Sequence, residues 1–124
     1  MQENKEALSS ISLSEVVVKG MTEKKASDII VMDLRHIHHA VADFFILCSG
    51  SSDTQIDAIS DSVEEEVYKF SQQDPWKTEG KQNKEWVLID YVDVVAHIFR
   101  KDKREFYALD ELWGDAKIKT VQEA

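Results

Sequence analysis

Two aspartates and one histidine interrupt the most apolar stretch of this 124-residue chain, the segment EWVLIDYVDVVAHIF at residues 85–99. Asp90 and Asp93 are three positions apart, and His97 follows four positions later. Acidic and imidazole side chains inside an apolar segment indicate a metal site, a catalytic site, a contact surface or a turn. The spacing of the residues decides which of these chemistries is possible.

A nucleotidyltransferase centre is the first possibility. Residues 48–53, CSGSSD, form a Gly-Ser turn between an apolar run and a predicted helix, and amides at a helix start can hold a phosphate. Such an enzyme also needs two carboxylates on one face of a strand to hold magnesium, so their spacing must be even. Asp90 and Asp93 point to opposite faces of an unbroken strand, and residues 64–66 are consecutive glutamates on a predicted helix. The spacing therefore argues against catalysis, and Ser52 is interpreted as a helix N-cap.

The other reactive side chains also favour structural roles. The HIHH segment at residues 36–39 could bind a transition metal, but its neighbours Asp33 and Asp43 lack ligand-like spacing, so we interpret it as a solvated loop. His97 alternates with other apolar residues on a predicted strand, which favours a packed or hydrogen-bonded imidazole. Cys48 follows four apolar residues and is predicted to be an inert core thiol. No serine occurs in a G-x-S-x-G turn. We therefore expect neither a metal nor a cofactor.

Hydrophobic periodicity predicts the elements that position these residues. The helix that starts at Ser52 has apolar residues at helical spacing and ends before Asp74-Pro75. Its predicted buried stripe is Ile56, Ile59, Val63, Val67 and Phe70. The other predicted elements are a helix at 12–25, strands at 27–34, 42–50, 76–80, 85–90 and 93–99, and a final helix at 104–113.

These elements predict an α/β fold with a mixed β-sheet of about five strands flanked by helices, in the order α-β-β-α-β-β-β-α. The last three strands are expected to form an antiparallel meander. One domain is predicted at residues 12–116, between a flexible N-terminal tail at 1–11 and a C-terminal tail at 117–124.

Composition limits the classes of partner. The net charge of −9 and pI near 4.8 disfavour a broad nucleic-acid surface and suit a basic protein partner. A single cysteine excludes an internal disulfide and fits a reducing cytoplasm. No secretory apolar segment and no run of about 20 apolar residues is visible, so we expect a cytoplasmic protein without a membrane partner.

With its acids interpreted as non-catalytic, the segment WVLIDYVDVVAHIF resembles the signature of the ribosome silencing factor family, also called the Iojap family. Further matches are ADFFILCSGSSDTQIDAISDSVEEEV, Glu79-Gly80 and REFYALDELWGDA. The resemblance covers about residues 13–116, in the family's order.

The resemblance implies a nucleotidyltransferase-like core without the catalytic acids, and a protein that is not an enzyme. It implies binding to the large ribosomal subunit through large-subunit ribosomal protein fourteen. It also implies a block of small-subunit joining that represses translation under nutrient limitation, and a possible homodimer when free. A large-subunit assembly factor and a nucleotide-binding or nucleotidyltransferase enzyme are the alternative functions.

The positions that match the family's contact surface are Trp86, Asp90, Tyr91, Asp93 and Tyr107. Trp86 and Tyr91 are implied contacts with the ribosomal protein, and Asp90 and Asp93 could face its basic side chains. Core packing is the alternative for Trp86.

Three positions near or beyond this surface leave questions open. Trp113 matches a further family position, and for Trp113 and Tyr107 both contact and core packing are open. Val92 stands where many relatives carry glycine, so either the valine is strained at positive φ or the backbone there differs. The histidine-rich loop at 36–39 is also unusual for the family.

Overall fold

The computed structural model describes residues 9–104 and 114–121. Its helices are α2 (Ser10–Glu23), α3 (Asp53–Ser71) and the short 3₁₀ helix η1 (Lys101–Lys103). Its strands are β1 (Ser27–Asp33), β2 (Phe44–Gly50), β3 (Lys77–Glu79), β4 (Trp86–Asp90), β5 (Val94–Arg100) and β6 (Lys117–Thr120). Nearly all of the predicted helix at 104–113 lies outside the described residues, and so do Tyr107 and Trp113.

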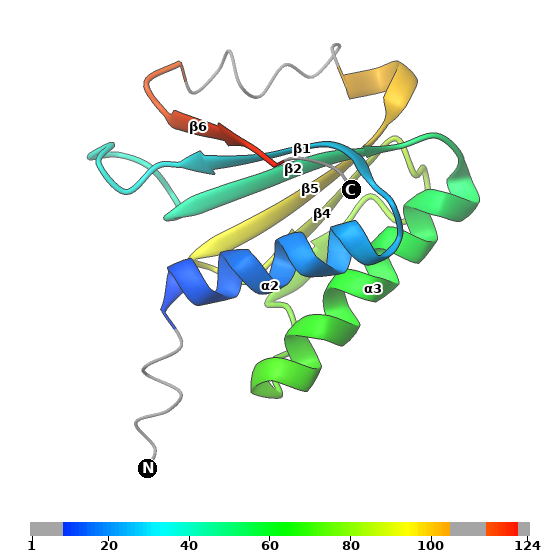
Figure 1. Ribbon diagram of the computed structural model, residues 1–124, viewed down its shortest axis with the longest axis horizontal. Coiled ribbons are helices and arrows are strands. Elements are labelled where there is room, and N and C mark those ends of the chain that lie inside the picture. The colour runs from blue at the N-terminus through cyan, green and yellow to red at the C-terminus, as the bar shows by residue number, and fades with distance from the viewer. Residues whose placement is uncertain (1–8, 105–113, 122–124) are drawn as a thin grey trace.

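The strands form one mixed sheet in the order β3-β4-β5-β2-β1-β6 (Figure 1). Strands β2 and β5 are parallel, and every other neighbouring pair is antiparallel. The predicted fold class and the meander of the last three predicted strands, now β3, β4 and β5, are confirmed.

The structure differs from the predicted C-terminal tail at residues 117–124. Residues 117–120 form β6, which pairs with β1 at the edge of the sheet and raises the strand number to six. Its four residues, KIKT, are all exposed, and with a single apolar side chain the segment is too short and too polar for a strand to be predicted from it. Pairing with β1, far away in the sequence, makes it a strand.

Helices α2 and α3 cover one face of the sheet (Figure 1). The core between these layers is aliphatic because both helices present an apolar stripe to the strands. Four of the five residues predicted for the α3 stripe are buried there, but Phe70 is 53% exposed. Spacing predicts which side of a helix is apolar, and it does not show whether another element lies opposite its last turn.

Gly20 allows α2 and α3 to approach each other closely. A Cβ at this position would lie 2.7 Å from the Cα of Val63, closer than real contacts allow. The Ser62 hydroxyl donates a hydrogen bond of 2.8 Å to the Gly20 carbonyl across the same contact. The glycine that lowers the helix propensity of α2 is therefore required by helix packing.

Candidate functional site

Strand β4 presents one row of side chains on the sheet face opposite the helices. Val87 and Ile89 are buried on the helix side, whereas Trp86, Leu88 and Asp90 alternate with them and are half-buried. Trp86 and Leu88 pack against a second apolar cluster on that outer face. The outer row of β4 therefore packs on this apolar cluster and remains partly exposed.

The Trp86 indole is held in one orientation by residues of β5. Its Nε1 donates a hydrogen bond of 3.0 Å to Nδ1 of His97, and its ring stacks on Phe99 with centroids 5.3 Å apart. The backbone of Trp86 also passes close to Gly80, where φ is +88° and a Cβ would collide with the Trp86 carbonyl oxygen, so only glycine fits there. The prediction of a packed or hydrogen-bonded His97 is confirmed, and the structure shows both features.

His97 itself is buried among aromatic rings. Phe45 contacts it edge-on at a centroid distance of 4.6 Å. Because Nδ1 accepts the hydrogen bond from Trp86, the neutral ring carries its proton on Nε2, which has no partner among residues 9–104 and 114–121. Burial penalises the charged form and lowers the pKa of His97 to about 3.

The chain reverses after β4 through a strained three-residue turn. The Asp93 amide donates to the Tyr91 carbonyl at 3.0 Å, which closes a γ-turn around Val92 at φ +78°. The Asp90 carboxylate accepts the Val92 amide at 2.7 Å and holds the turn in place. Positive φ is unfavourable for a β-branched residue, so of the two alternatives for Val92 the structure has the strained one.

Replacing Val92 with glycine is expected to raise the free energy of unfolding by about 1 kcal/mol, because glycine adopts positive φ without a steric cost. The Val92 side chain is 57% exposed, so its removal costs little packing. Thermal unfolding of Val92→Gly and Val92→Ala measures the effect. Alanine keeps the Cβ and most of the strain, and should give a smaller gain. A glycine variant that melts below the unmodified protein would contradict the assigned strain.

Tyr91 does not lie where an exposed contact residue is needed. Its side chain is 3% exposed and belongs to the core on the helix side. Burial, with further contributions from Glu64 and Asp74, raises the pKa of its hydroxyl. Neighbouring residues at a strand end point to opposite sides of the sheet, so Asp90 on the outer side sends Tyr91 inward. The expectation of Tyr91 as an exposed hot spot is therefore corrected to a core position.

Asp93 is exposed directly after the turn. Its backbone carbonyl accepts hydrogen bonds from the amides of Asp43 and Phe44, at 2.8 and 3.2 Å. These bonds tie the turn to the start of β2 while the Asp93 side chain stays exposed. Trp86 and Asp90 thus lie on the outer side of β4. Asp93 follows the turn and borders a hollow that Tyr91 and the facing ends of α2 and α3 also line. Tyr107 lies outside the described residues.

Sequence reasoning missed Trp76. Its side chain is 67% exposed, and its amide donates to the Asp90 carbonyl at 2.7 Å, which places it beside the end of β4. The exposure of Trp76 could have been predicted from the sequence, because a tryptophan directly after Pro75 in a polar stretch has no apolar neighbours with which to form a core.

The Gly-Ser segment before α3 acts as a helix start. The Ser52 hydroxyl accepts the Gln55 amide at 3.1 Å, which confirms the predicted N-cap. The Gln55 side chain accepts the Ser51 amide at 2.7 Å, one residue before the position a capping box uses. The amides that could hold a phosphate are therefore already partly engaged by side chains.

Cys48 and His36 are both tied into the fold. Cys48 is fully buried and its thiol pKa is raised by burial, which confirms an inert core thiol. The ring of His36 donates from Nε2 to the Asp115 carbonyl at 2.8 Å. Within residues 9–104 and 114–121, no three His, Cys, Asp or Glu side chains gather closely enough to hold a metal ion. None of the helices in those ranges has the length and apolar content that a membrane span needs.

Comparison with known proteins identifies the family. The family model described as "Ribosomal silencing factor during starvation" matches residues 7–124. Ribosomal silencing factor RsfS of Bacillus subtilis is 38% identical over 107 residues, 86% of this chain and 89% of the relative. Protein Iojap of Zea mays chloroplasts is also 38% identical over 86% of this chain, which spans 45% of that longer protein. The mouse protein named "Mitochondrial assembly of ribosomal large subunit protein 1" is 28% identical over 80% of this chain.

Solved structures agree with these matches. A crystal structure from Chromobacterium violaceum has a TM-score of 0.77 at 29% identity and covers 91% of this chain and 92% of its own. A second one, from Bacillus halodurans, has a TM-score of 0.72 at 33% identity and covers 90% and 97%. The sequence resemblance and the shared fold thus extend over nearly the whole chain, and the protein belongs to the ribosomal silencing factor family.

Proposed function

We propose that this protein represses translation by binding the large ribosomal subunit, chiefly through large-subunit ribosomal protein fourteen, and by blocking association with the small subunit under nutrient limitation. The observation that carries the proposal is the match of the silencing factor family to residues 7–124. The proposal places the protein in the cytoplasm with the ribosomes and includes a homodimer as the free form.

The docking surface we propose consists of Trp86, Leu88, Asp90, Val92 and Asp93, the outer row of β4 and the turn that follows it. A half-buried tryptophan held by its neighbours can bind without losing much side-chain freedom, which is typical of interface hot spots. The exposed acid at the turn suits the basic side chains of a ribosomal protein. Backbone strain concentrates at functional sites, and the γ-turn supports this location.

Steric exclusion requires no catalytic group, and the geometry of the two aspartates supports a protein that is not an enzyme. The Asp90 carboxylate is engaged by the Val92 amide at the end of β4. Asp93 follows after the turn and does not share a strand with Asp90. A magnesium pair on one strand face, as a nucleotidyltransferase requires, is not formed by these two residues.

A role in large-subunit assembly is the second candidate function. The mouse relative carries that role in its name. The same docking surface would serve both functions, and the difference lies in the particle that is bound. An assembly factor should accompany precursor particles, whereas a silencing factor should bind mature large subunits.

Co-sedimentation with separated, purified subunits tests the proposal. We expect pelleting with the large subunit alone, and we expect Asp93→Lys to weaken it with a smaller dependence on salt concentration, because one attractive charge becomes repulsive. Asp61→Lys on α3 is the matched control, since Asp61 is equally exposed on the helix side and has the same charge change. If both variants lose the same amount of binding, the net charge of the protein determines the affinity and the position of Asp93 at the turn does not. Absence of pelleting with either subunit would contradict the proposed function.

A further inference from the structure

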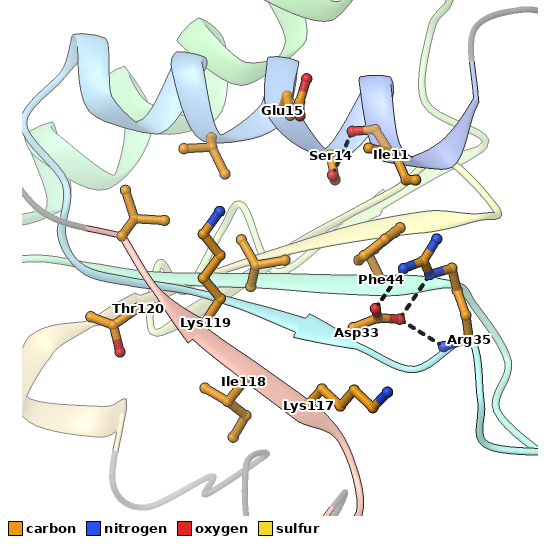
Figure 2. A pocket seen from close by; sticks show the side chains of 13 residues that line it. Ile11, Ser14, Glu15, Asp33, Arg35, Phe44, Lys117, Ile118, Lys119 and Thr120 are labelled. Carbon is orange, nitrogen blue, oxygen red and sulfur yellow. Dashed lines mark hydrogen bonds and ion pairs between the residues drawn. The ribbon is translucent and has the colours of Figure 1, made fainter.

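A groove of about 650 Å³ lies between α2 and the edge of the sheet formed by β1 and β6 (Figure 2). Helix α2 packs over β1, β2 and β5, and among the described residues no helix covers the corner beside β6. The groove and the proposed docking surface are separate, because β5, β2 and β1 lie between β4 and β6 in the sheet. The volume is in the range of small-molecule sites.

Aliphatic side chains from both layers line the groove. Ile11 and Val18 come from one side of α2, and Val31 comes from β1. Phe44 at the start of β2 and Val121 after β6 complete the apolar lining. This surface can contact a hydrocarbon chain over its length without leaving buried polar groups unpaired.

Basic side chains outnumber acidic ones around this apolar lining. Lys117 and Lys119 alternate along β6, so both lie on the same side of the strand, and Figure 2 shows Lys119 extending toward α2. Within the described ranges neither lysine forms an ion pair. Among these residues, no carboxylate competes with an external anion for the two ammonium groups.

The acidic side chains of the groove compete little for that anion. Asp33 is bound by Arg35 through two hydrogen bonds of 3.0 and 2.8 Å, and this pair holds the pKa of the Asp33 carboxyl at about 2. The Arg35 guanidinium also lies 5.0 Å from the centroid of the Phe44 ring. In Figure 2 the Glu15 carboxylate stays beside the α2 ribbon. Two cations next to an apolar groove are notable in a chain of net charge −9.

We propose that this groove binds an amphipathic anion, an unbranched alkyl chain of medium length that ends in a carboxylate. The chain lies along Ile11, Val18 and Val31, and the carboxylate meets Lys119 and Lys117 at the rim. Apolar contact supplies most of the affinity, and the two lysines determine the sign of charge that is accepted.

Titration of the isotope-labelled full chain with octanoate, octanol and octylammonium, followed by NMR amide shifts, tests both parts. We expect saturable shifts at the groove residues with octanoate, about fivefold tighter than with octanol, and the weakest binding with octylammonium. Equal affinity for all three probes would contradict the proposed selection of an anion by the two lysines. Absence of saturable shifts at the groove would overturn the site.

Paired variants separate the two contributions. Lys119→Gln should weaken the binding of octanoate and leave the binding of octanol unchanged. Glu15→Gln should strengthen the binding of octanoate, because it removes the only unpaired acid of the groove within the described ranges. Ile11→Ser should weaken all three probes, and Lys101→Gln on η1 is the matched control without effect. An affinity for octanoate that stays unchanged in Lys119→Gln or in Ile11→Ser would contradict the assigned geometry. Groove shifts that appear with the large ribosomal subunit and not with octanoate would overturn the proposal in favour of a protein contact.

Discussion

Trp86→Ala is expected to weaken binding to the large ribosomal subunit by at least about 2 kcal/mol, roughly thirtyfold in Kd. The indole is the largest side chain of the outer β4 row, and its hydrogen bond to His97 and its stacking on Phe99 hold it ready for contact. Truncation to alanine removes this contact area, so that the proposed docking surface keeps the acids at the turn but loses its large apolar residue. The effect should therefore exceed that of a charge change at the rim.

Sedimentation of a dilution series with purified large subunits measures the loss. Tyr68→Ala is the matched control, because Tyr68 is an aromatic residue, 50% exposed, on the helix side of the molecule. Thermal unfolding of both variants separates a lost contact from a lost fold. If Trp86→Ala binds normally, Trp86 is a packing residue and the docking surface lies elsewhere. If binding falls only together with the melting temperature, core packing explains Trp86.

The free energy of unfolding should fall by about 2 kcal/mol between pH 7.5 and pH 5 because of His97. The folded protein keeps this imidazole neutral, with a pKa of about 3, whereas the unfolded chain protonates it below its ordinary pKa of about 6.5. Between these two values the unfolded state binds more protons, so stability decreases as the pH falls. Above pH 7.5 the ring is neutral in both states and contributes no pH dependence.

Urea unfolding at several pH values, compared with His97→Phe, measures this slope. Phenylalanine retains an aromatic ring between Phe45 and Phe99 but cannot titrate, so the slope between pH 7.5 and 5 should flatten even if overall stability falls with the lost Trp86 hydrogen bond. His38→Asn is the control, because it removes an exposed histidine and leaves the buried His97 in place. A slope in His97→Phe equal to that of the unmodified protein would mean that other groups cause the acid sensitivity.

The sequence by itself determined the features that depend on local patterns. Periodic apolar residues gave α2, α3 and the long strands, because a face buried against another layer must recur at the period of its element. The cap at Ser52, the inert Cys48 and the packed His97 followed from immediate neighbours in the chain. The motifs at 42–67 and 86–99 also indicated the family, because long motifs in a fixed order are specific.

Tertiary structure decided what depends on contacts between distant segments. Strand β6 exists because β1 offers it a free edge, and its own four residues, with one apolar side chain, are too few and too polar to predict a strand. Trp86 and His97 are diagonal neighbours across the β4–β5 pair, in which Trp86 lies opposite Phe99. The sequence of one strand does not determine the register in which it pairs with the other.

The turn after β4 gives the same lesson. In the γ-turn Val92 adopts a positive φ. At the end of the strand the side chain of Tyr91 points into the core, and that of Asp90 points to the outer side of the sheet. Sequence identified these residues as a group, but the side of the sheet on which each one lies was fixed only when the chain folded. The reason is physical, since a one-residue change in register reverses the direction of every side chain in a strand.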